Sequence, residues 1–413
     1  MMKRLKNITI SEYDYSLPPE RIAQFPLAER DKSKLLYYKN GNIKEEVFEN
    51  IADFLPEKCL LIFNETKVIQ ARLIFQKETG ARIEIFCLEP VEPSSEIQLA
   101  FQQRSYSVWK CFIGNSKRWK KGQLQKSFEF NNKKCLLTAE RKEQEQSVSL
   151  VEFKWEPADL TFSEILELSG LVPLPPYLNR KAVESDKFRY QTVYAKNNGS
   201  VAAPTAGFHF TDKVFKKLIS KNIQFDKLTL HVGAGTFKPV IAETIQQHEM
   251  HYEKMLVKKS TIKKLLENNE KKIISVGTTT TRTLESLYWF GIKLIVENSP
   301  LVEFTIRQWD PYLEKYNKHI STRDSLLAVL NYMNNSGIEI LTGFTQLMIV
   351  PGYDFKIIDG IITNFHQPKS TLLLLIAAFI GDDWKKAYDF ALANNFRFLS
   401  YGDSCLFLKS MRQ

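Results

Sequence analysis

The feature that most constrains this fold is a tract of short apolar runs, rich in β-branched and aromatic residues, between positions 60 and 153. Turn residues separate the runs, and short strands with short spacers are typical of antiparallel barrels and sandwiches. The runs occupy residues 60–63, 71–75, 81–86, 97–101, 107–113, 135–138 and 148–153. We therefore predict an antiparallel barrel or sandwich over residues 60–153, inserted into a larger domain, with the polar tract 115–147 as its hairpin loops.

After this tract, patterns typical of helices alternate with patterns typical of strands. The expected helices are 212–220, 261–268, 280–289, 324–333 and 384–394, and the expected strands are 225–232, 272–276, 337–341 and 404–408. Such alternation indicates a sheet that is covered by helices. We therefore predict an α/β fold in which residues 1–59 and 154–413 form a mixed-sheet α/β catalytic domain.

The composition limits the class of protein. With 44% apolar and 25% charged residues, the chain has the composition of an ordinary soluble globular protein. Five scattered cysteines without C-x-x-C spacing argue against a disulfide framework and a zinc site, and for a reducing cytoplasm. The longest apolar run, 372–380, is far shorter than the roughly 20 residues of a membrane span. A net charge of +10 suits an RNA partner, and a merely lysine-rich surface is the alternative.

A first candidate site lies between positions 188 and 211. Arg189, Tyr190 and Tyr194 are close together there, and the small residues that follow around Thr205 let backbone approach a ligand closely. His209 then stands between two phenylalanines. The alternative is a tightly packed loop around a core histidine. Four comparable patches elsewhere in the chain favour a ligand site.

One of these patches is a short glycine loop. His231 lies near the end of an apolar strand, and Gly233 and Gly235 follow it. The pattern superficially resembles the first motif of Rossmann-type methyltransferases, in which the loop opens a helix. Here the next residues, 237–240, look extended. We interpret the segment as a tight loop that lines a pocket, with a packed β-turn as the alternative.

A second patch combines a strand with the start of a helix. An apolar strand leads through Gly277 into four consecutive threonines. The free N–H groups and the positive dipole end of a helix N-terminus suit a carboxylate or a phosphate. N-capping by threonine is the alternative. We favour ligand binding by Thr278 and Thr279, with Arg282 completing the clamp.

A third patch, at another strand-to-helix crossing, supplies Asn364, His366 and Lys369 as candidate site residues. Elsewhere His248 and His251, with two neighbouring glutamates, have a spacing that suits metal ligands on a helix. A third ligand has no obvious source in the sequence. We therefore predict no metal.

Five motifs carry a resemblance to a known family. They are R-Y-Q-T-V-Y-A-K (189–196), S-V-A-A-P-T-A-G-F-H-F (200–210), L-H-V-G-A-G-T-F-K-P-V (230–240), G-T-T-T-T-R-T-L-E-S (277–286) and N-F-H-Q-P-K-S-T-L (364–372). The chain resembles the S-adenosylmethionine:tRNA ribosyltransferase-isomerase family of queuosine biosynthesis. The match is collinear from Tyr13 to Phe407.

The resemblance implies an α/β domain with an inserted β-barrel and a reaction on tRNA. Family members use S-adenosylmethionine as a ribosyl donor, and the acceptor is the aminomethyl-deazaguanine base in the anticodon. The ribose is rebuilt into an epoxycyclopentane, with release of adenine and methionine. We therefore expect S-adenosylmethionine as co-substrate and tRNA as partner, no membrane contact, and a monomer.

Such a reaction needs a base whose pKa lies near neutrality and an acid for the departing adenine. The candidates are His209, His231, His251 and His366, with Asp359 and Asp403 behind them. The other expected contacts are Arg189, Tyr190 and Tyr194 for the RNA bases, Thr278, Thr279 and Arg282 for the methionine carboxylate, and Arg21, Arg30 and Lys32 for RNA phosphates. Which histidine takes which role stays open at this stage.

The chain also departs from the family pattern. Gln346 stands where the family usually has Asp, and Gln367 stands where leucine is common. The segment 288–340 looks longer than is typical. These departures would suit a related S-adenosylmethionine-dependent enzyme with another acceptor. A non-catalytic RNA-binding module is the third alternative.

Overall fold

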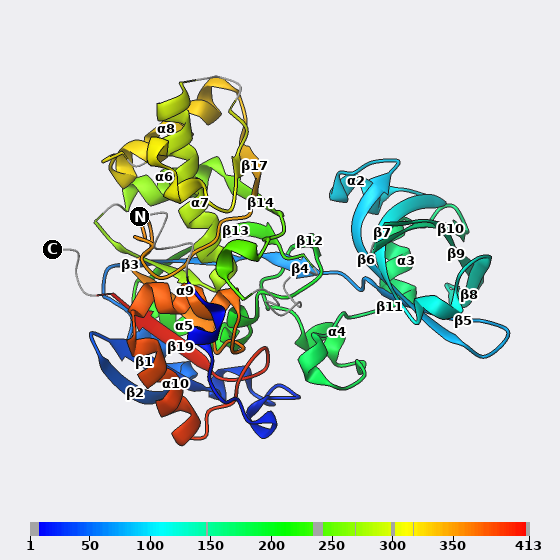
Figure 1. Cartoon of the computed structure of the whole chain (residues 1–413), viewed down its shortest axis with the longest axis horizontal. Coiled ribbons are helices and arrows are strands. Elements are labelled where there is room, and N and C mark those ends of the chain that lie inside the picture. Colours follow the sequence, from blue (N-terminus) through cyan, green and yellow to red (C-terminus); the bar gives the residue numbers. More distant parts are fainter. Residues whose placement is uncertain are drawn as a thin grey trace.

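The computed structural model describes residues 8–145, 148–233, 243–268, 270–298, 302–316 and 318–409. Figure 1 shows two parts: a large body, in which helices cover a sheet, and a smaller curled sheet to one side of it. The seven-stranded curled sheet and the ten-stranded sheet of the large body share no strand. This arrangement confirms the expected mixed α/β fold with a separate antiparallel sheet.

The ten-stranded sheet forms the centre of the large body. In spatial order its strands are β16 (Thr305–Ile306), β17 (Ile340–Thr345), β14 (Glu253–Lys258), β13 (Gln224–His231), β3 (Cys59–Asn64), β15 (Lys272–Val276), β18 (Gly360–Asn364), β19 (Ser404–Leu408), β1 (Lys34–Lys39) and β2 (Asn42–Val47). The four central strands, β13, β3, β15 and β18, are mutually parallel. Their carboxyl ends therefore meet at one edge of the sheet.

Strand β3 corrects the expected boundary of the inserted domain. The run 60–63 was expected in the barrel, but it pairs with β13 and β15 at the centre of the large sheet. Every residue of β3 is buried: Leu60 and Ile62 belong to one apolar cluster, and Leu61 and Phe63 to another. An apolar run that is buried on both faces is typical of a central parallel strand. Composition alone does not separate it from the neighbouring barrel runs.

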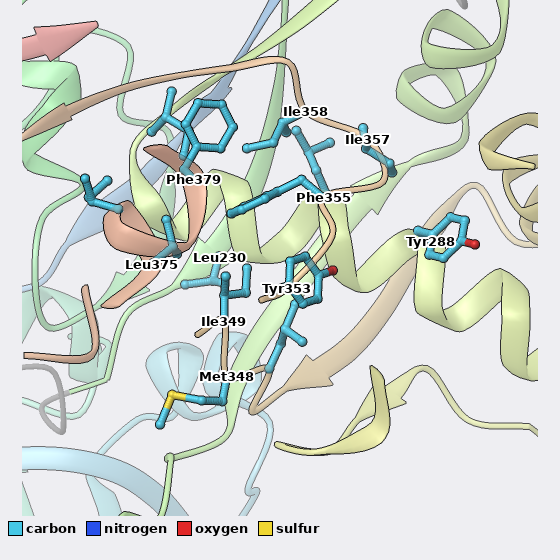
Figure 2. Packing of buried hydrophobic residues seen from close by; sticks show 14 of the residues in the cluster. Leu230, Tyr288, Met348, Ile349, Tyr353, Phe355, Ile357, Ile358, Leu375 and Phe379 are labelled. Atoms are coloured by element: carbon cyan, nitrogen blue, oxygen red, sulfur yellow. The ribbon is translucent and has the colours of Figure 1, made fainter. Parts of the chain in front are cut away.

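Helices cover both faces of this sheet. One cluster joins the sheet to α6 (Lys259–Glu267), α7 (Thr278–Glu297), α8 (Thr322–Asn335), α9 (Thr371–Ile380) and α10 (Asp383–Ala393). The other cluster joins it to α5 (Asp212–Ser220) and to the 3-10 turn η4 (Phe48–Asp53). Figure 2 shows the first cluster where Met348, Ile349, Tyr353 and Phe355 pack beside the helices. This packing holds α7 against the sheet with its N-terminus at the carboxyl edge.

The curled sheet is antiparallel throughout. Its strands in order are β11 (Gly170–Leu171), β5 (Arg72–Gln76), β6 (Arg82–Glu92), β7 (Tyr106–Gly114), β10 (Val148–Glu156), β9 (Lys133–Glu145) and β8 (Gln123–Phe130). Trp109 and Phe162 lie in its buried core, which helix α3 (Phe162–Ser169) helps to cover. In the part of the chain that the structure describes, no ladder joins β8 to β11. The expected separate antiparallel sheet is thus confirmed. It is curled into a half-barrel.

Two details of this region differ from the sequence prediction. The run 97–101, expected as a strand, lies in helix α2 (Ile97–Gln102), whose Ala100 and Phe101 are buried. The polar tract 115–147, expected as hairpin loops, contains the whole of β8 and of β9. These two strands expose alternate side chains along much of their length, so their low apolar content concealed them.

Among the described residues, no helix is long and apolar enough to cross a membrane.

Candidate active site

A cavity of about 690 Å³ opens at the carboxyl edge of the central parallel strands. Residues that follow β13, residues that follow β15 and the last residues of β18 line it, namely Val232–Gly233, Gly277–Thr279 and Thr363–Asn364. This is the edge at which open α/β sheets bind their ligands. The volume lies within the range of about 300–1,000 Å³ that is usual for small-molecule sites.

The cavity brings together half of the predicted site residues. Those that line it are Tyr190, Thr205, Gly233, His251, Thr278, Thr279, Arg282, Asn364, His366 and Lys369. Gly235 was also predicted, but it lies outside the described residues. Each of the five sequence motifs contributes to the wall. Motifs that are far apart in the chain therefore meet at one place.

Helix α7 presents its N-terminus to this cavity. Gly277, with φ +91°, turns the chain from β15 into the helix, a conformation that L side chains rarely adopt. Thr278 and Thr279 follow in the cavity wall, and the Thr279 hydroxyl accepts a hydrogen bond of 3.3 Å from Asn64 Nδ2. The free N–H groups of the first turn give this end of the helix a positive potential.

One turn into α7, Arg282 is almost completely buried in the same wall, with 6% of its surface exposed. Its Nε donates to the backbone oxygen of Leu347 at 3.0 Å, and its Nη1 forms an ion pair with Glu253. Its Nη2 has no hydrogen-bond partner among the described residues. Glu253 was not predicted as a site residue. It follows a polar loop at the start of β14, and no local pattern marks it as a partner of Arg282.

The opposite wall carries Asn364 and His366. The amide oxygen of Asn364 accepts a hydrogen bond from the Thr205 hydroxyl at 3.1 Å. His366 Nε2 lies 3.0 Å from the hydroxyl of Thr363, and the ring is half-buried. Burial lowers the pKa of His366 to about 3, so the imidazole is neutral near pH 7. A pKa this low makes the imidazole a weak base, so a role as base requires a bound ligand that raises the pKa.

His209 does not line the large cavity. It is buried, its Nδ1 lies 2.7 Å from Ser33 Oγ, and its Nε2 accepts a hydrogen bond of 3.1 Å from the Asn364 amide. Burial is the main cause that lowers the pKa of His209 to about 3. Since both nitrogens bond to the chain, the ring orients Asn364 and has no position from which to contact a ligand. The core-histidine alternative describes it better.

His231 also lies behind the wall and not in it. Its Nδ1 is 2.9 Å from Thr66 Oγ1, and burial is the main cause that lowers its pKa to about 4. A Cβ at Gly199 would lie 2.8 Å from the His231 ring, so the residue there must be glycine. The ring therefore packs against two short paired strands, β4 (Thr66–Val68) and β12 (Asn197–Ser200), and its neighbours Val232 and Gly233 reach the cavity instead.

Four other predicted residues lie away from the cavity. Asp359 precedes β18 at the edge opposite Asn364 and pairs with Lys272 Nζ at 3.0 Å. Asp403 is buried and accepts hydrogen bonds from the backbone of Lys34 and Arg397. The remaining two pack elsewhere: Arg189 donates to the carbonyls of Leu27 and Ala28, and Tyr194 packs edge-on against Phe63. These four residues are therefore not part of the cavity wall.

Two of the three predicted RNA-phosphate contacts, Arg30 and Lys32, are likewise engaged within the chain. The Arg30 guanidinium donates to the carbonyls of Phe188, Arg189 and Gln191 at 2.6 to 3.2 Å. Lys32 Nζ pairs with Glu49 at 2.7 Å, and Arg21 ends a 3-10 turn, Pro19–Arg21. Arg30 thus fastens the loop that follows α4 (Asp186–Arg189) to the N-terminal segment.

The sequence also missed an aromatic side of the cavity. Tyr177 lines it beside Tyr190, and the Tyr177 hydroxyl lies 2.6 Å from Ser400 Oγ. Burial raises the pKa of Tyr177 to about 12. Among the described residues, no group of three or more His, Cys, Asp or Glu is placed to hold a metal ion.

Comparison with known proteins now identifies the family. A family model described as "Queuosine biosynthesis protein" matches residues 10–407. The chain belongs to this family. Queuosine biosynthesis proteins named S-adenosylmethionine:tRNA ribosyltransferase-isomerase are 40% identical over 405 residues in Halothermothrix orenii and 38% identical over 404 residues in Thermotoga maritima. Each alignment covers 97% of this chain and 99% of the relative.

A crystal structure of S-adenosylmethionine tRNA ribosyltransferase from Thermotoga maritima also matches, with 29% identity and a TM-score of 0.44. That match covers 96% of this chain and 100% of the other. The family model and the relatives confirm the resemblance that was drawn from the sequence motifs. The five motifs that carried this resemblance surround the cavity in this chain.

Proposed function

We propose that this queuosine biosynthesis protein is an S-adenosylmethionine:tRNA ribosyltransferase-isomerase. It transfers the ribosyl group of S-adenosylmethionine to 7-aminomethyl-7-deazaguanine in a tRNA anticodon and isomerises it, which gives epoxyqueuosine-tRNA, adenine and methionine. The observation that carries the proposal is the full-length relationship to relatives of this name, together with the meeting of all five motifs at one cavity.

The chemistry of the cavity supports this reaction. A sulfonium is favoured by aromatic faces and carboxylates, and the wall supplies Tyr177, Tyr190 and Glu253. The acceptor base must leave its stack in the anticodon to enter a pocket, as in other enzymes that modify a base. The cavity is open on one side of the large sheet and has the volume of a small-molecule site.

Two histidines in the wall are the proposed acid and base. His366 takes the proton from the carbon beside the sulfonium, because it lines the cavity and no described hydrogen bond engages its Nδ1. His251 is exposed at the mouth of the cavity and acts as the acid for the departing adenine. Full turnover by His366→Ala would remove His366 from this role.

We also propose that the enzyme acts as a monomer in the cytoplasm, with tRNA as its partner. The +10 net charge supports the RNA partner, because phosphate neutralisation provides most sequence-independent affinity. The five cysteines, all free and buried, support a reducing compartment. The proposed domains are an α/β catalytic domain and an inserted domain. Strand β3 belongs to the catalytic domain, because it pairs with β13 in the large sheet.

The test is product analysis after mixing the protein, S-adenosylmethionine and a tRNA that carries the aminomethyl-deazaguanine base. We expect adenine and methionine in equal amounts and a heavier tRNA nucleoside. S-adenosylhomocysteine would instead indicate methyl transfer and would overturn the proposal. Binding of both ligands without turnover would favour a different acceptor or a binding module.

A further inference from the structure

The third nitrogen of Arg282 is the starting point. Two of the three guanidinium nitrogens are fixed by Leu347 and Glu253, which sets the plane of the group. The third, Nη2, is buried in the cavity wall without a partner among the described residues. A buried donor of a charged group that lacks an acceptor is costly. A ligand acceptor at this position would remove that cost.

The start of helix α7 points to the same corner. Thr278 and Thr279, its first two residues, line the cavity together with Arg282. The helix is 20 residues long, so its N-terminal N–H groups carry the full positive end of the helix dipole. The N–H groups of this turn therefore favour a negative charge in the part of the wall that Arg282 also lines. Both features favour an anionic oxygen.

The charge balance of the wall decides which anion fits. The charged residues of the described wall are Glu249, Glu253, Arg282 and Lys369, two of each sign. Glu253 already pairs with Arg282, and Lys369 pairs with Asp14 at 2.8 Å. A phosphate would bring up to two negative charges into a wall with no surplus of positive charge. A zwitterion, whose ammonium can face Glu253, leaves the balance unchanged.

We propose that this corner binds the amino-acid arm of S-adenosylmethionine, with the α-carboxylate on Arg282 Nη2 and the α7 N-terminus and the ammonium towards Glu253. This assignment rests on the proposed function, since it places one end of its co-substrate. Glu253 is then a positioning residue for Arg282 as well as a contact for the ammonium. The adenosyl end extends towards the side of Tyr177 and Tyr190.

The test compares three ligands by equilibrium binding: S-adenosylmethionine, its decarboxylated form, and methylthioadenosine, which lacks the whole amino-acid arm. We expect the unaltered protein to bind S-adenosylmethionine about 10- to 100-fold more tightly than the decarboxylated form, because a charge-assisted hydrogen bond is lost. Equal affinities for these two ligands would overturn the assignment. This comparison needs no variant and so does not depend on folding.

The matched variant is Arg282→Lys, which keeps the charge beside Glu253 but lacks the second Nη donor. We expect it to weaken S-adenosylmethionine binding by about 10- to 100-fold while methylthioadenosine binding changes less than about 2-fold. An equal loss for both ligands would make Arg282 a purely structural residue and would overturn the assignment. If the unaltered protein bound none of the three ligands, even with tRNA present, the proposed function itself would fail.

Discussion

Two buried charges on helix α7 lie one turn apart and have opposite surroundings. Glu285 is fully buried, and its carboxylate accepts hydrogen bonds of 2.8 to 3.2 Å from the backbone N–H groups of residues 356–358 and from the Tyr353 hydroxyl. Arg282 is nearly as buried but keeps one nitrogen without a partner among the described residues. Both come from the same motif, 277–286.

The difference teaches how to separate structural from ligand-binding charges. Burial raises the pKa of the Glu285 carboxyl, against the opposing effect of its four donors, and the group fastens the loop after Tyr353 to α7. The chain saturates Glu285 but leaves Arg282 short of an acceptor at the cavity. The same contrast separates His209, bonded at both nitrogens, from His366, which presents its ring to the cavity.

The largest expected effect is on the saturated side. Glu285→Ala leaves three backbone donors and the Tyr353 hydroxyl without their acceptor, so we expect the free energy of unfolding to fall by about 4 kcal/mol. Denaturant unfolding measures this change. The protein that remains folded should bind S-adenosylmethionine as the unaltered protein does. A loss of affinity as large as that of Arg282→Lys would break the comparison.

Arg30 is expected to behave like Glu285 and not like Arg282. Arg30→Lys loses the fork that reaches the carbonyls of Phe188, Arg189 and Gln191, so we expect a fall of about 2 kcal/mol in the free energy of unfolding. The affinity for tRNA should change less than about 2-fold, since the guanidinium is held by the chain. If the salt dependence of tRNA binding fell by about one phosphate contact, Arg30 would be an RNA contact after all.

The buried histidines predict an acid-sensitive fold. The pKa values of His209 and His366 are lowered to about 3, whereas unfolded histidine titrates near 6.5. The unfolded state therefore binds more protons below pH 6.5, and stability falls as the pH drops from about 6.5 towards 3. Each histidine contributes up to about 2 kcal/mol of this loss at pH 5. The unfolding free energy of His209→Gln should differ less between pH 7.5 and pH 5 than that of the unaltered protein. An equal difference in the two proteins would show that His209 does not have a lowered pKa in the fold.

The smallest effect is expected from a single hydroxyl at the cavity. Thr278→Val should weaken S-adenosylmethionine binding by about 3- to 5-fold, the value of one neutral hydrogen bond, with stability unchanged. Thr280→Val is the matched control, because the Thr280 hydroxyl bonds to the Val276 carbonyl at 2.7 Å and does not line the cavity. Equal losses of affinity in the two variants would argue against a ligand at the start of α7.

Local signals in the sequence predicted much of the fold. Two such signals are the capping box at Thr161, where α3 begins, and Asn40-Gly41, which forms the turn between β1 and β2 with positive φ at both residues. The run 60–63 was misplaced because a strand's partners, here β13 and β15, are distant in sequence. Helix α2 was missed because its apolar residues lie in a segment as short as a strand.

The candidate site was predicted in outline and not in detail. The motifs supplied the candidate residues, and the structure shows that residues of all five line one cavity. The role of His209 could not be read, because its partners Ser33 and Asn364 lie more than 150 residues away from it in the chain. Arg30 likewise meets its acceptors only through folding. Whether a polar group is saturated depends on such distant partners, so the distinction drawn here requires the structure.

The central claim is that the unsaturated corner at Arg282 receives the amino-acid end of S-adenosylmethionine. The most direct measurement is a crystal structure of the protein with S-adenosylmethionine bound. We predict that a carboxylate oxygen lies about 2.7–3.2 Å from Arg282 Nη2, at the start of α7, with the ligand inside the cavity. The account would be contradicted if the ligand lay outside this cavity, or if Arg282 Nη2 were bonded to the chain while the carboxylate lay elsewhere.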